Sequence, residues 1–279
     1  MIGLSISKKM GKLLTYLILI ITAIFVLYPT FWIITGSMNP GDSLFSTKLI
    51  PESLSLKHYV ALFNETDYLL WYLNTLKIAF WNMIFSTILV ITAAYAFSRF
   101  RFPGRKQGLM AMLVLQMFPG FMGMIAIYIL LLQMDLLDNH WGLILVYSGG
   151  SIAGGAWLVK GYFDGLPKSI EEAAKIDGAS HIQIFYKIML PLSKPMIIFV
   201  AVNNFIGPWM DFIFARLVLR SNENKTLAIG LFEMVAGRQN TEFTTFAAGA
   251  VLVALPITIL FFIFQDHLVE GLKAGANKG

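Results

Sequence analysis

The residue types that carry out chemistry in proteins are few in this chain and widely spaced. There is no cysteine, which excludes disulfides, thiolate metal sites and a cysteine nucleophile. The four histidines are far apart and lack metal-ligand spacing, so no metal site is expected: they are His58, His140, His181 and His267. No G-x-x-x-x-G-K-S/T phosphate-binding loop occurs, so the chain is not expected to hydrolyse ATP or to be an enzyme.

The segment 163–194 is too polar to cross a membrane and too regularly patterned for a loop. Ser169 and Glu172 fit a capping box, which predicts a helix from there to Ile176. Gly178 stands where that helix should stop, because glycine accepts the positive φ of a helix C-terminus. We therefore expect a short helix followed by a glycine turn.

A second helix is predicted directly after this turn. Ser180 and Gln183 form a second possible capping box. One apolar stripe at helical spacing follows, formed by Ile182, Phe185, Tyr186 and Met189. Two prolines, Pro191 and Pro195, are expected to end the helix. Residues 166–191 thus form a helix–turn–helix.

The first of these helices carries a small-residue patch, Ala173 and Ala174, that would let another surface approach closely. Charges of both signs surround the patch: Glu171, Glu172, Lys175 and Asp177. Either the element seats in a groove of a partner protein, or it rests on lipid headgroups. Interfacial helices usually carry a strongly basic polar face, so the mixed charges favour docking on a protein.

Composition defines the elements that must position this segment. The chain has 279 residues, of which 57% are hydrophobic and 13% charged, with a mean hydropathy of +0.70. Such a chain is an integral membrane protein, in which the position of each charge relative to the spans matters more than the net charge of +5, and no nucleic-acid partner is expected. Six apolar stretches are long enough to span a bilayer as helices: about 13–35, 71–97, 109–132, 141–162, 195–214 and 246–264. We predict an all-α fold with one transmembrane domain, 1–279, and a short extra helix near 56–63.

Lysine and arginine predict the orientation of the spans. They are concentrated at the amino terminus and in the connections after the second and fourth spans, for example at Arg99, Arg101, Arg105 and Lys106. The positive-inside rule places these connections and both termini in the cytoplasm. The multi-pass chain is therefore expected in a cytoplasmic membrane, with the helix–turn–helix on the cytoplasmic side.

Amide side chains stand out within the spans. The candidates for the solute pathway are Asn82, Gln116, Asn203 and Asn204, together with the nearby Trp209. Amides in lipid need partners, so each either bonds a neighbouring helix or faces the solute. Gly207-Pro208 is expected to break or kink the fifth helix, and Pro119-Gly120 to bend the third. Gly150 and Gly154, flanked by Ser151 and Gly155, predict tight helix packing.

The helix–turn–helix resembles the EAA motif of permease subunits of binding-protein-dependent ABC importers. The matching residues are Glu172-Ala173-Ala174, Asp177-Gly178-Ala179, Ile188 and Leu190-Pro191. Stretches 28–38, 208–212, 227–231 and 268–275 are similar to carbohydrate permeases, in particular those of the maltose/maltodextrin (MalG-type) branch.

This resemblance implies a type I importer permease whose core is about 71–265 and whose coupling segment is 166–191. The residues expected to contact the ATPase are Glu172, Ala173, Ala174, Asp177, Gly178 and Ala179. The implied partners are a second permease subunit in a heterodimer, a cytosolic ATPase dimer that holds ATP and magnesium, an extracytoplasmic sugar-binding protein, and lipid. The tract 215–245 would approach the sugar-binding protein. No cofactor is expected on this chain.

The alternative is a secondary transporter or channel for a small neutral solute. It would need intramembrane ionisable relays or an internal repeat, and the sequence has neither. The favoured function is therefore one half of the translocation pathway of an ATP-driven sugar importer, for maltose or maltodextrin.

Overall fold

The structure, a computed structural model, describes residues 2–41, 51–236 and 242–276, and its regular secondary structure there is helical. It contains two compact units, one made of Met1–Asp67 and Leu231–Ala254 and the other of Tyr68–Gly230 and Leu255–Gly279. Four helices are each long and apolar enough to cross a bilayer: Met10–Ser37, Tyr68–Arg99, His140–Gly165 and Phe243–Gly271. The predicted all-helical membrane fold is confirmed.

Two pairs of helices with a sharp bend between them are, taken together, apolar and long enough to be further candidate spans. Arg105–Met117 and Gly120–Gln133 meet at 97°, and His181–Leu192 and Lys194–Met210 meet at 79°. The first bend lies at Pro119, as predicted. With each pair taken as one span, the described residues contain six, the number expected from the sequence.

At Gly207-Pro208 a break or a kink was predicted; the break is wrong, and the kink stays a prediction. Helix α10 (Lys194–Met210) continues through Pro208 and ends at Met210, with Asp211 as its C-cap, so it stops short of the predicted span bound at 214. Proline removes one helical hydrogen bond, and the carbonyl that it leaves free receives a donor from another helix, described below.

The first unit contains α1 (Ile2–Ser37), α2 (Lys57–Asn64) and the adjoining parts of α12 (Leu227–Ala236) and α13 (Phe243–Ala276). Helix α2 confirms the short helix predicted near 56–63. His58 is buried there, with Nδ1 3.1 Å from Oγ1 of Thr245 and Nε2 3.2 Å from the carbonyl oxygen of Gly41. His58 therefore connects α2 to the side chain of Thr245 and to the backbone of Gly41. From Met10 to Ile34 the large apolar side chains of α1 are exposed, except for the half-buried Trp32, as expected of a helix that faces lipid.

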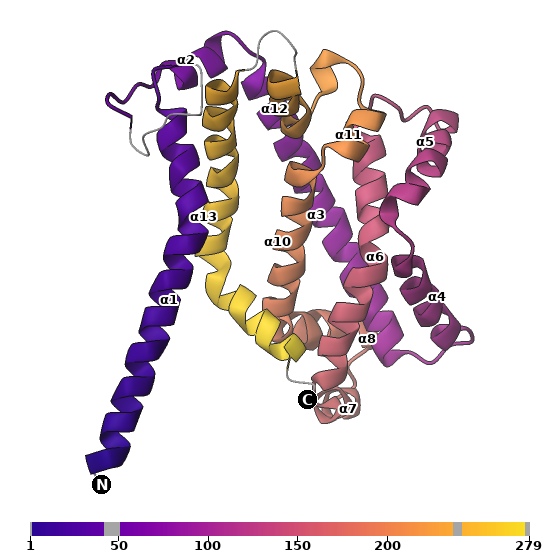
Figure 1. Cartoon of the computed structure of the whole chain (residues 1–279). Helices are drawn as coiled ribbons and strands as arrows, with labels where there is room; N and C mark the ends of the chain where they lie inside the picture. The colour runs from indigo at the N-terminus through magenta and orange to yellow at the C-terminus, as the bar shows by residue number, and fades with distance from the viewer. Residues whose placement is uncertain (1, 42–50, 237–241, 277–279) are drawn as a thin grey trace. The chain divides into compact units, whose positions relative to one another are not determined.

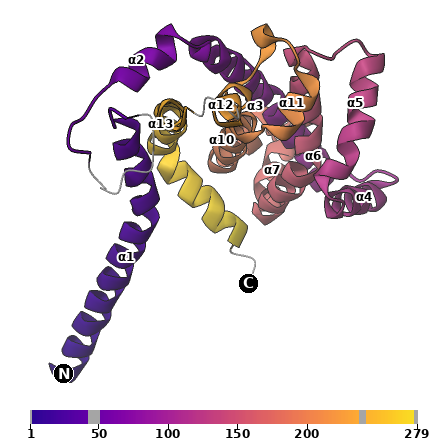
Figure 2. The same ribbon diagram turned by 45° about the horizontal axis from the view of Figure 1, so that its top comes forward.

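The second unit is built on α3 (Tyr68–Arg99), which packs against α6 (His140–Gly165) and α10 (Figure 1). Its apolar core lies in two clusters. One cluster, with Tyr95, Phe163 and Met189, surrounds the end at which α3 and α6 finish. The other lies near the opposite end, where α5 (Met124–Gln133) lies beside α6 (Figure 2).

The remaining elements of the second unit are short. They are α4 (Arg105–Met117), a 3₁₀ turn Gly120–Gly123, α7 (Lys168–Ile176), α8 (His181–Ile184), a π-helical segment Phe185–Met189, α9 (Leu190–Leu192), α11 (Ile213–Val218) and a 3₁₀ turn Asn222–Asn224.

Close approach of α6 to α3 depends on a glycine. A β-carbon at Gly155 would lie 2.7 Å from Cγ2 of Val90, whereas one at Gly150 would meet nothing within 4 Å. A β-carbon at Gly154 would face the side chain of Gln116 at 3.2 Å. The predicted tight packing is present at Gly154 and Gly155 but wrong at Gly150, and Gly155 permits the α3–α6 contact.

Candidate coupling segment and the polar groups of the spans

The turn between α7 and α8 has the geometry that the sequence predicts. Gly178 has a φ of +83°, a conformation in which a side chain would be strained. The amide N–H of Ala179 donates to the carbonyl of Ala174 at 2.9 Å, and that of Gly178 to the carbonyl of Lys175 at 3.0 Å. These bonds satisfy the last carbonyl groups of α7 and fix the angle at which α8 leaves it.

One of the two predicted capping boxes is present. The amide N–H of Gln183 donates to the hydroxyl oxygen of Ser180, and the Gln183 side chain accepts from the Ser180 amide. The box predicted at Ser169 and Glu172 is wrong, because α7 begins one residue earlier, after Pro167, with no side-chain capping bond. Ser169 therefore lies within the first turn.

The single apolar stripe predicted for the second helix is also wrong. Ile184 and Met189 are buried, whereas Ile182 and Tyr186 are 73% and 66% exposed. Residues Phe185–Met189 are π-helical, so the spacing of an α-helix does not hold along the whole predicted stripe. The helix also continues past Pro191 to Leu192.

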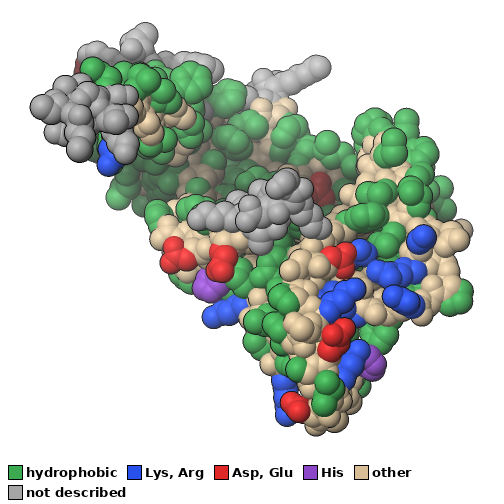
Figure 3. Space-filling view, turned by 90° about the horizontal axis from the view of Figure 1, so that it is seen from below, with side chains coloured by type: hydrophobic (Ala, Val, Ile, Leu, Met, Phe, Trp, Pro, Cys, Tyr) green, Lys and Arg blue, Asp and Glu red, His purple; other side chains and the backbone are tan. Residues whose placement is uncertain are grey.

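The residues predicted to contact an ATPase form an accessible surface. Glu172, Ala173, Asp177 and Gly178 are exposed, and Ala174 and Ala179 are half-buried. Next to them Ile176 is 87% exposed, which is unusual for isoleucine outside an interface. Charged side chains of both signs gather on this end (Figure 3). A small apolar surface ringed by charges is suited to binding a protein groove.

A buried ion pair holds α7 against the end of α3. Nε of Arg99 lies 2.5 Å from Oε1 of Glu171, and both side chains are 8% exposed. From the sequence, Glu171 was predicted only to be one of the charges around Ala173 and Ala174, and its pair with Arg99 was not predicted. The available signal was an arginine at the end of a span together with an acid directly before the EAA string.

The same arginine connects α7 to α6. Nη2 of Arg99 donates to the carbonyl of Phe163 at 2.8 Å, and Nη1 to the hydroxyl of Ser98 at 2.8 Å. Ser98 in turn donates to Asp164, which also pairs with Lys160 at 2.5 Å. The ends of α3, α6 and α7 are thus joined by charge-assisted hydrogen bonds.

Among the predicted pathway residues, Asn82 and Asn204 are in contact. Nδ2 of Asn82 donates to the carbonyl oxygen of Asn204 at 2.7 Å, and its Oδ1 accepts from Ser86 at 2.8 Å and Ser148 at 3.3 Å. Asn82 is buried, and these bonds join α3, α6 and α10. Asn82 therefore makes polar contacts between helices.

The other pathway candidates are not gathered into one site. Asn203 and Gln116 are exposed, and each donates to a carbonyl of its own helix, of Phe199 at 2.8 Å and of Met112 at 3.4 Å. Trp209 is buried between Tyr72 and Phe205. The part of the chain that the structure describes holds no group of three or more His, Asp or Glu residues that could bind a metal.

At the other end of the second unit, Asp138 organises part of the tract 215–245, of which residues 237–241 lie outside the described ranges. Its carboxylate accepts from the amides of Arg220 at 2.9 Å and Ser221 at 3.0 Å, and Nδ2 of Asn224 donates to its carbonyl at 2.7 Å. Partial burial opposes ionisation, but these donors outweigh it and lower the pKa of Asp138.

Known proteins resemble the chain over its whole length. Residues 86–274 match the family described as binding-protein-dependent transport system inner membrane component. The chain is 43% identical to the galactooligosaccharides transport system permease protein GanQ and 42% to the maltodextrin transport system permease protein MdxG, both of Bacillus subtilis, each with 99% of both chains covered. A bacterial ABC transporter chain involved in alginate import has the same fold, with a TM-score of 0.80, 24% identity and coverage of 94% of this chain and 98% of that chain.

Proposed function

Because this chain belongs to the family of binding-protein-dependent transport system inner membrane components, we propose that it is the permease subunit of an ATP-driven sugar importer. The observation that carries this proposal is the α7–Gly178–α8 element, which exposes Ala173 and Ile176 and is held to the spans by the Arg99–Glu171 pair. An exposed element with a rigid internal connection can transmit force from a partner.

The partner that supplies this force is a cytosolic ATPase dimer. It holds ATP and magnesium, while this chain binds no cofactor and catalyses no reaction. Glu172, Ala173, Ala174, Asp177, Gly178 and Ala179 contact the ATPase. When the ATPases close, α7 moves, and its buried connections carry the movement to α3 and α6.

A second permease subunit forms the other half of the pathway, in a heterodimer. Both termini and α7 face the cytoplasm of a bacterium, and the tract 215–245 lies on the outer side, where an extracytoplasmic sugar-binding protein delivers the solute. Along the pathway, the exposed amides of Asn203 and Gln116 contact the sugar, and the buried Asn82 and Trp209, with the half-buried Asn204, shape its wall.

The substrate is an oligosaccharide of the maltodextrin class. Galactooligosaccharides are a second candidate, because the relatives named for the two sugars are 42% and 43% identical to this chain. Uptake of labelled maltotriose, with unlabelled maltodextrin or galactooligosaccharide as competitor, separates the two.

The test is ATP hydrolysis by the chain reconstituted in liposomes with its co-purifying subunits. We expect hydrolysis that rises when the sugar-loaded binding protein is added. Hydrolysis that does not respond to the binding protein contradicts the proposal. Sugar uptake that survives ATP depletion while the ion gradient is maintained would instead support a secondary transporter.

A further inference from the structure

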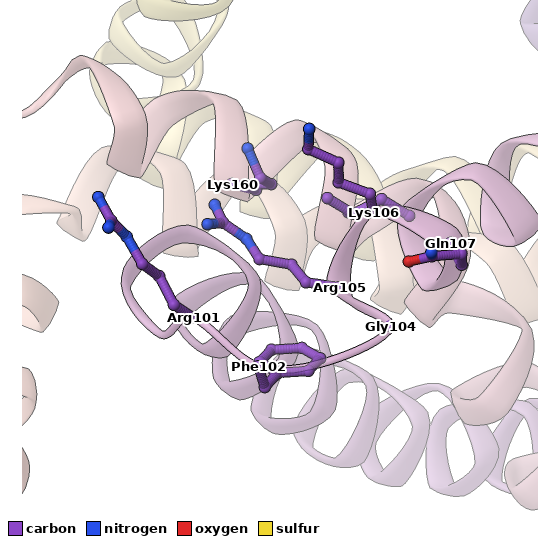
Figure 4. Close-up of a pocket in the computed structure, with 8 residues that line it drawn as sticks. Arg101, Phe102, Gly104, Arg105, Lys106, Gln107 and Lys160 are labelled. Carbon is purple, nitrogen blue, oxygen red and sulfur yellow. The ribbon is translucent and has the colours of Figure 1, made fainter.

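A basic pocket of about 540 Å³ lies where three predicted spans end. Its lining comes from the α3–α4 connection, the first turn of α4 and one residue of α6: Arg101, Phe102, Gly104, Arg105, Lys106, Gln107, Leu109 and Lys160. Arg101, Arg105, Lys106 and Lys160 extend to the same side of the pocket (Figure 4). Four cationic side chains and no acidic one line this pocket.

Most of this positive charge is uncompensated. Lys160 pairs with Asp164, but the guanidinium of Arg105 bonds only neutral carbonyl oxygens, of Phe97 at 2.8 Å and Ser98 at 3.4 Å. Within the described residues, neither Arg101 nor Lys106 has a hydrogen-bond or ion-pair partner. Three cations in one pocket are therefore available to an anion.

The fold, and not chance exposure, brings these cations together. The chain reverses between α3 and α4 at Gly104, whose φ is +83°. The Arg105 bonds to the end of α3 hold the reversed chain in place, and Nε1 of Trp157 donates to the carbonyl of Leu109 at 3.0 Å, which fixes α6 beside α4. Lys160, one turn after Trp157, thereby reaches the pocket.

The position of the pocket relative to the ends of the predicted spans indicates which kind of anion it binds. It lies at the end of the span Tyr68–Arg99, at the start of the bent pair beginning at Arg105, and one turn before the end of the span His140–Gly165. Directly after it along α4, Met110 and Val114 are 60% and 45% exposed and offer an apolar surface. A phosphate beside an apolar surface at the boundary of a bilayer is the arrangement of a phospholipid.

We propose that this pocket binds a phosphate group, namely that of an anionic phospholipid headgroup. Arginine offers a planar pair of donors to phosphate oxygens and lysine a mobile point charge, so Arg101, Arg105 and Lys106 together match a phosphodiester that keeps its negative charge. A zwitterionic lipid also brings a cation close to these groups, so the pocket discriminates against it. The inference requires only that the chain spans a membrane and is independent of the transported sugar and of the ATPase.

The test compares lipid retention by charge variants. The full-length chain, with the subunits that it retains, is placed in nanodiscs of equal phosphatidylglycerol and phosphatidylcholine with identical acyl chains, and native mass spectrometry counts the lipids that stay bound. We expect Arg101→Gln/Lys106→Gln to lower the phosphatidylglycerol preference by about tenfold. Both residues are exposed and unpartnered, so folding is retained, and Arg101→Lys/Lys106→Arg should keep most of the preference.

A matched control removes two charges outside the pocket. Lys187→Gln/Lys194→Gln affects exposed lysines elsewhere in the second unit and should leave the preference within twofold of the unmodified protein. An equal loss in this control, or an unchanged preference in Arg101→Gln/Lys106→Gln, overturns the proposal. So does loss of a co-purifying protein subunit with unchanged lipid retention, which would make the pocket a protein contact.

A second arm distinguishes a lipid from a free ion. Inorganic phosphate at 10 mM, an order-of-magnitude choice for a weak anion site, is added to the nanodiscs, with sodium chloride at equal ionic strength as the reference. Retention that is the same in both salts supports the lipid, because the apolar surface of α4 adds to its binding. Displacement by phosphate alone assigns the pocket to the free ion and overturns the lipid.

Discussion

The side-chain amide of Asn82 on α3 donates, at 2.7 Å, to the backbone carbonyl oxygen of Asn204 on α10. Residue 208, which would normally donate to that carbonyl within the helix, is Pro208 and has no N–H. The amide of one span thus replaces the hydrogen bond that proline removes from another, and α10 continues to Met210 without a break.

This relationship predicts that substitutions at Asn82 and Pro208 have non-additive effects on the free energy of unfolding. Asn82→Leu should lower the free energy of unfolding by about 1–3 kcal/mol, because a buried carbonyl loses its donor. In a Pro208→Ala background the helix supplies its own N–H, and the same substitution should have a smaller effect. Thermal unfolding in detergent of the two single variants and the double variant measures this coupling, and strictly additive effects would contradict it.

The buried ion pair predicts a large effect from a single charge. Glu171→Gln should destabilise the protein by about 3–5 kcal/mol, because Arg99 is left buried without its counter-charge, and should weaken the link between ATP hydrolysis and sugar uptake. Glu172→Gln, at the exposed neighbour, is the control and should change stability by about 0.5 kcal/mol or less. Unfolding is measured for both variants, and the ratio of sugar imported to ATP hydrolysed for Glu171→Gln. Equal stability of the two variants would refute the role of Glu171.

The turn at Gly178 predicts a defect confined to coupling. Gly178→Val places a β-branched residue at a φ of +83°, which should reorient α8 and reduce sugar-stimulated ATP hydrolysis while the spans still insert. Gly178→Asn should retain more activity, because asparagine tolerates the left-handed conformation. Membrane insertion is checked by protease protection, and full coupling in the valine variant would exclude this role of the turn.

The contact between α3 and α6 predicts that a glycine-to-alanine substitution affects stability differently at Gly155 and at Gly150. Gly155→Ala should destabilise the protein by about 1–3 kcal/mol, because the new methyl group would overlap the side chain of Val90. Gly150→Ala, five residues earlier on the same helix, should be neutral or stabilising, because its methyl group meets nothing within 4 Å and alanine favours helix. Melting temperatures in detergent test the pair, and the reverse order would show that the contact is not tight.

Asp138 predicts a loss of stability in acid. Its pKa is lower in the folded protein than in the unfolded chain, so its contribution is fully present above the unfolded value of 3.8 and is lost as pH falls through the folded value. Asp138→Asn should flatten the decline in melting temperature below pH 4 and lower the melting temperature near neutrality. Parallel pH curves for the two proteins would exclude this contribution.

The sequence by itself determined the class of the protein and its most informative segment. Long apolar stretches require helices in a bilayer, because backbone groups there have no water to bond, and this argument gives the spans from local composition alone. The Gly178 turn and the Ser180 cap were predicted for the same reason, since both depend on residues within one turn of each other.

Tertiary structure alone decided which polar groups meet. The partner of Arg99 is 72 residues away in the chain and that of Asn82 is 122 residues away, so no local pattern could identify them. Of the apolar stripe predicted after Ser180, Met189 is buried as expected, but Ile182 and Tyr186 are exposed and Ile184 is buried instead; α-helical spacing could not show that Phe185–Met189 is π-helical. Interactions between distant residues depend on how the helices pack, and packing is set by shape and burial across the whole unit rather than by the order of neighbouring residues.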